Sequence, residues 1–314
     1  MLPKNSSLKF QNILWTQGYE SMFHEPVMVE EVCRFLLQGE GVYVDATVGG
    51  GGHARALLER LGESSLLVGI DRDEEALREA RERLKPFAMR VHLLHGRFSR
   101  LSELLFSLGL KRVRGILFDL GVSSWQLEES RRGFSFEREG PLDMRMDTSQ
   151  KHTAFDLIHT LSEKELTTIL RELGEEKYAH RIARVIVHHR KQKPITTTTE
   201  LSSIVAQVVP GKGKIHPATR TFMALRIAVN EELEELSRAL PQVPSLLEAG
   251  GRVVVLSYHS LEDRVVKSFF RGCPELRVLT KKPLMPLPEE IKRNPRARSA
   301  RMRVAERISL EGDA

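Results

Sequence analysis

Short apolar runs alternate with amphipathic stretches from about residue 27 to residue 121. The apolar runs predict strands, and the amphipathic stretches predict helices. The expected strands are 42–48, 66–71, 91–95 and 115–120, and the expected helices are 27–37, 53–61, 73–84 and 99–108. The strands are almost unbroken Val, Ile, Leu and Phe, which is typical of parallel strands covered by helices on both faces. This region therefore predicts a doubly wound α/β domain.

The alternation stops after residue 124, and the pattern changes to helices and loops up to about residue 215. A long helix is expected around 218–240, a strand at 252–256, a helix at 261–271, and closing strands at 277–279 and 302–308. One interrupted domain explains this order better than two tandem domains. We expect residues 23–124 and 216–314 to form the sheet domain, and residues 125–215 to form an inserted, mainly helical subdomain. Residues 1–22 show no such pattern and are expected to be a flexible N-terminal arm.

Composition agrees with a soluble globular protein, because 41% of the 314 residues are hydrophobic and 29% are charged. The two cysteines, Cys33 and Cys273, are too few for a disulfide framework and have no CxxC spacing. They indicate a reducing, cytoplasmic location and no structural metal. No apolar run approaches the roughly 20 residues of a membrane span. The first 22 residues also lack the apolar segment of a secretory signal.

Positive charge is concentrated in two regions of a chain whose formal net charge is +6. Residues 177–193 contain six Lys or Arg and no acid, and residues 281–314 contain nine basic and five acidic residues. In the first region, Lys177, Arg181, Arg184 and Lys191 fall on one face of the predicted helix. Such a face is either simply solvated or makes contacts with nucleic-acid phosphates. The sequence leaves both interpretations open, and the four residues are candidates for RNA binding.

A glycine-rich loop follows the first predicted strand, where Gly49–Gly50–Gly51–Gly52 leads into His53. Glycine lets the backbone approach a ligand closely at this position of an α/β sheet. Gly49, Gly51 and Ala54 satisfy the G-x-G-x-x-A pattern of dinucleotide binding, so an NAD-dependent oxidoreductase is one hypothesis. Asp45 at the end of the strand would repel a pyrophosphate, whereas it would attract the sulfonium and ammonium groups of S-adenosylmethionine. The second cofactor is therefore favoured.

Other strand ends supply further candidate side chains. Asp71 ends the second strand, where a carboxylate can accept hydrogen bonds from ribose hydroxyls, and Asp73 is expected to cap the next helix. Phe98 follows the third strand and either stacks on an adenine or packs in the core. Asp119 ends the fourth strand, as a candidate proton acceptor or cofactor ligand. His259 follows the fifth strand, either to handle a proton or to make a structural hydrogen bond.

Several motifs together resemble one family, the bacterial RsmH (MraW) methyltransferases. The matching segments are HEPV at 24–27, DAT at 45–47, GGH at 51–53, IDRD at 70–73, FDLGVSS at 118–124, RGFSF at 132–136, GPLDMRMD at 140–147, HPATR at 216–220 and SYHSLEDR at 257–264. The resemblance covers residues 24 to 307, and GPLDMRMD is its most distinctive segment. It implies a class I methyltransferase fold with an inserted helical domain.

The resemblance also implies a reaction and a set of ligand contacts. The expected reaction is transfer of a methyl group from S-adenosylmethionine to N4 of a cytidine in the decoding region of 16S ribosomal RNA, with ribosomal RNA or the small subunit as partner. The implied cofactor residues are Gly51, Gly52, His53, Asp71, Phe98, Asp119 and Gln126, of which Gln126 rests on the resemblance alone. A non-catalytic RNA-binding assembly factor remains the third hypothesis. The oligomeric state stays open, with a dimer among the options.

Overall fold

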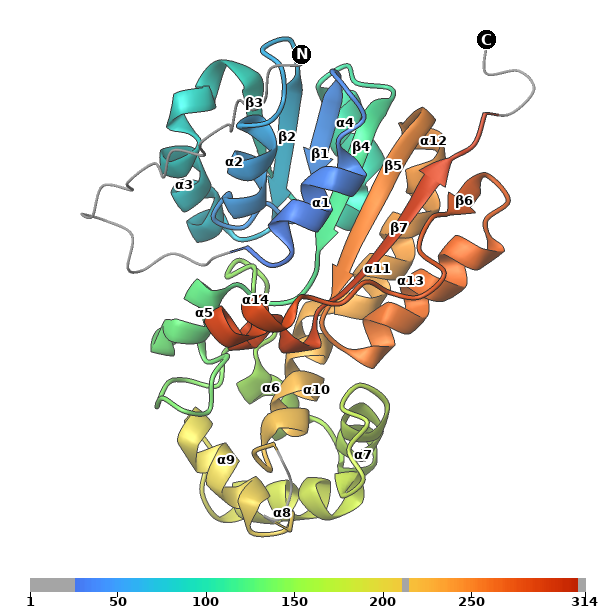
Figure 1. The fold of residues 1–314 in the computed structure, drawn as a ribbon. Helices are drawn as coiled ribbons and strands as arrows, with labels where there is room; N and C mark the ends of the chain where they lie inside the picture. The colour runs from blue at the N-terminus through green and yellow to red at the C-terminus, as the bar shows by residue number, and fades with distance from the viewer. Residues whose placement is uncertain (1–25, 211–214, 310–314) are drawn as a thin grey trace, which may run out of the picture.

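The computed structural model describes residues 26–210 and 215–309, which form one seven-stranded sheet with a helical unit at its carboxyl edge (Figure 1). The strand order is β3-β2-β1-β4-β5-β7-β6. The strands are β1 (Val42–Asp45), β2 (Leu66–Asp71), β3 (Val91–His95), β4 (Val113–Asp119), β5 (Leu247–Ser257), β6 (Leu276–Val278) and β7 (Arg301–Arg307). The expected arm, residues 1–22, lies outside the described residues, as do His24 and Glu25 of the first motif.

The sheet is mostly parallel, which confirms the predicted fold class. The pairs β1–β2, β1–β4, β2–β3 and β4–β5 are parallel, whereas β7 runs antiparallel to both β5 and β6. Strand direction decides where the ligand side lies. The carboxyl ends of β2, β1, β4 and β5 meet at one edge, and the chain order reverses between β1 and β4. Ligands of open α/β sheets bind at such an edge.

Helices cover both faces of the sheet because successive strand residues point to opposite sides. Tyr43 of β1 packs with one buried cluster and Val44 with the other. One face is covered by α4 (Leu101–Ser107), α11 (Glu232–Ala239), α12 (Val243–Leu246) and α13 (Ser260–Gly272), and the other by α1 (Val29–Leu36), α2 (Gly52–Leu58) and α3 (Glu74–Arg83). The short helix α14 (Pro288–Arg293) precedes β7.

The helical unit has a hydrophobic core of its own. It contains α5 (Ser124–Glu128), α6 (Ala154–Thr160), α7 (Glu163–Glu172), α8 (Ala179–Gln192), α9 (Thr198–Ala206) and α10 (Thr219–Asn230). Its buried cluster runs from Phe134 to Val229 and includes Phe222 and Leu225 of α10. The packing therefore extends beyond residue 215 to the end of α10. In Figure 1 the unit lies below the carboxyl edge of the sheet, with α8 at the far end.

The prediction of one long helix over 218–240 is wrong, because α10 ends at Asn230 and α11 begins at Glu232. Glu231 between them has a left-handed conformation, with φ of 51° and ψ of 37°. The carbonyl of Asn230 accepts a hydrogen bond from Arg72 Nη1 at 2.8 Å, and the Asn230 side chain binds the backbone of Met144 and Met146. These contacts from distant parts of the chain hold the break in place.

Among the described helices, none combines the length and apolar character needed to cross a membrane.

Candidate functional site

A cavity of about 550 Å³ opens at the carboxyl edge of the sheet. Its volume falls in the range of small-molecule sites. Its wall includes Asp71 and Asp119 at the ends of β2 and β4, Tyr258 just after β5, and His53 in the first turn of α2, which follows β1. The helical unit and α11 close the opposite side with Thr219, Arg226, Glu232 and part of the segment 121–127. The cavity therefore lies between the sheet and the helical unit.

The glycine loop is fastened by its own backbone. Gly49, at a φ of 51°, donates its N–H to Asp71 Oδ2 at 2.8 Å, and Gly51, at a φ of 81°, donates to the Val48 carbonyl at 2.8 Å. These donors are directed at protein acceptors, which leaves them unavailable to a pyrophosphate. Gly49, Gly50 and Gly52 line the cavity, whereas Gly51 faces Leu84 and Ala80 in the packing behind the loop. Gly49 and Gly51 therefore offer no backbone donor to a dinucleotide.

Asp71 and Asp73 organise the rim beside this loop. Asp71 Oδ1 accepts the Asp73 N–H at 2.9 Å, so each Asp71 oxygen is held by one backbone donor and keeps a further lone pair. Asp73 caps α3 by accepting from the Glu75 N–H at 3.0 Å, which confirms the predicted cap. Asp73 Oδ2 also accepts from Gln126 Nε2 and Arg132 Nη2, both at 2.8 Å. Gln126 therefore reaches the cavity wall with its amide already oriented.

Phe98 lines the cavity from the turn after β3 and also belongs to the core packing. Its ring meets the ring of Phe118 edge to face, with centroids 5.7 Å apart. The two interpretations of Phe98 are compatible, because one ring face can pack while the other borders the cavity.

Asp119 is held between two side chains, His53 from the first turn of α2 and Tyr258 from the position just after β5. Tyr258 Oη donates to Asp119 Oδ1 at 2.8 Å, and His53 Nδ1 lies 3.3 Å from Asp119 Oδ2. His53 Nε2 lies 2.9 Å from the Val27 carbonyl. Burial alone would lower the pKa of His53, but the hydrogen bond and charge of Asp119, with the charge of Asp45, outweigh it and raise that pKa. The three side chains form a connected row, His53–Asp119–Tyr258.

Carboxyl groups dominate the electrostatics of the strand ends. Burial, opposed by His53 and reinforced by Asp119 and Asp71, raises the pKa of Asp45 to about 7. Burial likewise raises the pKa of Asp71. A cation arriving in the cavity would relieve this repulsion, whereas an anion would increase it. The surroundings suit the positively charged S-adenosylmethionine.

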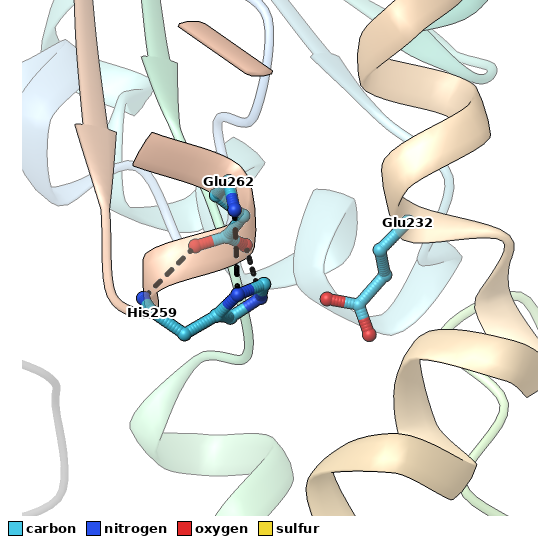
Figure 2. Close-up of side chains that lie close together, drawn as sticks. All are labelled: Glu232, His259 and Glu262. Atoms are coloured by element: carbon cyan, nitrogen blue, oxygen red, sulfur yellow. Dashed lines mark hydrogen bonds and ion pairs between the residues drawn. The ribbon is translucent and has the colours of Figure 1, made fainter. Parts of the chain in front are cut away.

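His259 is part of the cap of α13 (Figure 2). It is not among the residues that line the cavity. Its Nδ1 accepts the Glu262 N–H at 3.4 Å, and its Nε2 lies 3.1 Å from Glu262 Oε1. Burial would raise the pKa of Glu262, but His259 and Arg226 lower it overall. This geometry favours the structural interpretation of His259 over the proton-handling one.

Glu232, His259 and Glu262 place ligand-type atoms within 4.8 Å of one another (Figure 2). Arg226 occupies both oxygens of Glu232, at 2.8 and 2.9 Å. Because His259 Nδ1 accepts a hydrogen bond, a neutral imidazole carries its proton on Nε2, the nitrogen that would have to bind a metal. The cluster is therefore better described as a buried hydrogen-bond network beside the Arg226–Glu232 ion pair. The sequence analysis did not identify Arg226, Glu232 and Glu262 as cavity residues. Charged residues within the otherwise apolar stretch after residue 218 could have indicated them.

The predicted basic face is present on α8. Arg181, Arg184 and Lys191 are exposed there, while Ile182 and Ile186 are buried, and Lys177 is exposed just before the helix. Arg184 Nε lies 3.7 Å from Glu163 Oε1 on α7, so the face has an acidic neighbour that is remote in sequence. We call Lys177, Arg181, Arg184 and Lys191 the basic face.

The sheet order, the antiparallel β7 and the acidic site beside a glycine loop define a class I S-adenosylmethionine-dependent methyltransferase. The model of the MraW methylase family matches residues 21–308, so the chain belongs to this family. The resemblance seen in the motifs is thus confirmed.

Relatives of known name match over nearly their whole length. Ribosomal RNA small subunit methyltransferase H of Caldicellulosiruptor saccharolyticus is 49% identical over 305 residues, which cover 91% of this chain and 99% of that protein. The protein of the same name from Persephonella marina is 51% identical over 292 residues, with the same coverage of each chain.

Proposed function

We propose that this protein transfers the methyl group of S-adenosylmethionine to N4 of a cytidine in the decoding region of 16S ribosomal RNA. The observation that carries the proposal is the position of Asp119, held by His53 and Tyr258 in the wall of the cavity that also contains the glycine loop. The names of its relatives support small-subunit ribosomal RNA as the substrate.

The residues of the cavity fit this cofactor. When bound, S-adenosylmethionine supplies an activated methyl group on a sulfonium. The free lone pairs of Asp71 would accept the ribose hydroxyls, and Phe98 would border the adenine. Gly52 and His53 would flank the methionine part of the ligand, with Gln126 at the rim. Gly51 would act indirectly, by allowing the loop to turn against Leu84 and Ala80.

Asp119 would act on the target amine. The N4 lone pair of cytosine is delocalised into the ring, so the amine is a weak nucleophile. A carboxylate that accepts a hydrogen bond from N4 opposes this delocalisation, and it can take the proton once the nitrogen has been methylated. Tyr258 fixes Asp119 Oδ1, and this contact also sets the orientation of Asp119 Oδ2. We assign His259 a supporting role, as the cap that holds the β5–α13 turn bearing Tyr258.

The helical unit would bind the RNA that surrounds the target nucleotide. We propose that it comprises the insertion 125–215 together with α10, and that Lys177, Arg181, Arg184 and Lys191 contact phosphates. The working partner would be ribosomal RNA or the small subunit, in the cytoplasm.

Deleting the gene and measuring the nucleotide by mass spectrometry tests the reaction. We expect the N4-methyl mark to vanish and to return when the intact gene is restored. An unchanged mark would contradict the proposal. Equilibrium binding separates the alternatives, since an oxidoreductase requires NAD to bind, whereas we expect S-adenosylmethionine to bind and NAD not to.

A further inference from the structure

We propose that His53 is the final acceptor of the proton that leaves the target amine, and that the proton reaches it through Asp119. This inference rests on the proposed function and assigns His53 a role beyond contact with the cofactor. The evidence for it is that the two ring nitrogens of His53 face different partners.

The Val27 carbonyl fixes one end of the imidazole. A carbonyl can only accept, so at 2.9 Å His53 Nε2 carries a hydrogen. His53 Nδ1 then faces Asp119 Oδ2 at 3.3 Å. A neutral His53 presents a lone pair to that carboxylate, and a charged His53 presents a proton. Any proton placed on Asp119 Oδ2 therefore lies next to a nitrogen that can take it.

The surroundings favour storing a proton at this pair. His53 is 5% exposed, and the titratable groups around the pair are carboxyl or phenol groups of three strand ends, namely Asp45, Asp71 and Tyr258. The charges of Glu262 and Glu290 also act on the Tyr258 hydroxyl. Loss of solvent and the Asp119 carboxylate raise the pKa of Tyr258 well above its ordinary value, so its hydroxyl remains a donor. Within the described residues, the base beside Asp119 is thus His53.

Charge balance supplies the reason for this arrangement. The N4 lone pair forms the new nitrogen–carbon bond, the sulfur keeps the electrons of the broken bond, and the positive charge moves to the nitrogen. The nitrogen releases its proton to Asp119, and Asp119 releases it to His53 Nδ1. The charge lost by the sulfonium then resides on an imidazolium in the same cavity. Because moving a net charge into or out of a buried site is costly, this exchange lowers the barrier.

The exchange requires His53 to be neutral when the cationic cofactor is bound. The positive charge of the sulfonium disfavours a protonated imidazole nearby, so cofactor binding should release a proton from His53. S-adenosylhomocysteine has the same shape without the methyl group and without that charge, and should not expel this proton. The two ligands therefore form a matched pair for measuring the protonation of His53.

Calorimetric titration at pH 7, in two buffers of different ionisation enthalpy, counts the protons released on binding. We expect S-adenosylmethionine to release more protons than S-adenosylhomocysteine, by up to about one. Asp45, whose pKa is about 7, would also lose a proton beside a sulfonium, so both measurements are made in an Asp45→Asn background. In that background the difference should persist, and it should disappear when His53→Gln is added. Equal release by the two ligands, or a difference that survives in His53→Gln, would overturn the proposal.

Kinetics with small-subunit RNA provides the second measurement. We expect His53→Gln to lower kcat by about 10- to 100-fold while KM for S-adenosylmethionine changes less than about threefold. The rise of kcat with pH that reports neutral His53 should be lost in this variant. A rise in KM alone would mean that His53 only binds cofactor. Failure of the proposed function would look different, because the intact protein itself would then leave N4 unmethylated.

Discussion

The strand ends and the far side of the helical unit differ in both the sign and the burial of their charged groups. At the strand ends, carboxyl groups are enclosed, and each is held by specific donors, as Asp119 is by Tyr258 and Asp71 by Gly49. On α8, Arg181 and Lys191 extend into solvent. Enclosed charges interact strongly and depend on geometry, whereas exposed charges are screened and act together. Single substitutions at the strand ends should therefore have measurable effects, whereas on α8 only combined substitutions should.

The largest expected effect is on the reaction itself. Asp119→Asn preserves the shape of the side chain and an acceptor for Tyr258, but it cannot take a proton. We expect kcat to fall by about 10²- to 10⁴-fold in single-turnover methylation of small-subunit RNA. Affinity for S-adenosylhomocysteine, measured by calorimetry, should change far less. Activity within a few-fold of the parent would exclude Asp119 as the acceptor.

Neighbouring arginines offer the sharpest comparison of enclosed and exposed charge. Arg132 is 4% exposed and binds Asp73, Glu75 and two backbone carbonyls, whereas Arg131 is 60% exposed and pairs with Glu75 and Glu129. Removing one partner of a buried pair typically costs about 3–5 kcal/mol. We expect Arg132→Met to lower the free energy of unfolding by roughly that amount in urea titrations. Arg131→Met should unfold close to the parent, and equal losses in the two variants would contradict the contrast.

Cofactor affinity should depend on Asp71. In Asp71→Asn one oxygen becomes an NH₂ group that cannot accept from the ribose and repels the Gly49 donor. Hydrogen bonds to charged groups contribute about 1.5–3 kcal/mol, so we expect Kd for S-adenosylmethionine to rise by about 10- to 100-fold. Glu74→Gln, three residues along and exposed, is the matched control and should bind as the parent does. An unchanged Kd in Asp71→Asn would remove this residue from the site.

Asp45 should make the stability of the ligand-free protein depend on pH. Its pKa of about 7 in the folded protein exceeds that of an unfolded chain. Its contribution to stability is therefore complete at about pH 4 and is lost as the pH rises through about 7. We expect Asp45→Asn to flatten the free energy of unfolding between about pH 4 and pH 8. The same slope in the variant and the parent would show that Asp45 ionises normally.

The smallest effect per residue is expected on the basic face. Reversing Arg181, Arg184 and Lys191 to Glu together should weaken RNA binding and reduce the salt slope by up to about 0.9 per lost phosphate contact on duplex-like RNA. The control reverses Lys85, Lys267 and Arg271, which are exposed on the sheet domain. If both triple variants lose affinity equally, the basic face contributes only net charge.

Local patterns predicted the sheet and the helix cap at Asp73, because strand periodicity and capping depend on residues close in sequence. The break at Glu231 could not be predicted, since it depends on Arg72 and Met146 reaching Asn230 across the fold. The same limit applied to the four glycines. Their spacing identifies a ligand loop, but only the three-dimensional turn shows that Gly51 faces Leu84. The predicted position of His259 after a strand end is correct. Its orientation as a helix cap could not be predicted, because it depends on the contact with Glu262.

The insertion of the helical unit between β4 and α11 has a consequence for how the chain folds. Phe118 and Val255 are register partners in adjacent parallel strands, although 137 positions separate them. Closing so long a loop costs chain entropy, and topologies rich in such distant pairings fold slowly. Contacts within the helical unit, such as those between α7 and α8, join segments that are close in sequence and can form early. Once formed, they shorten the free chain that the β4–β5 pairing must close, so the helical unit would also speed assembly of the sheet.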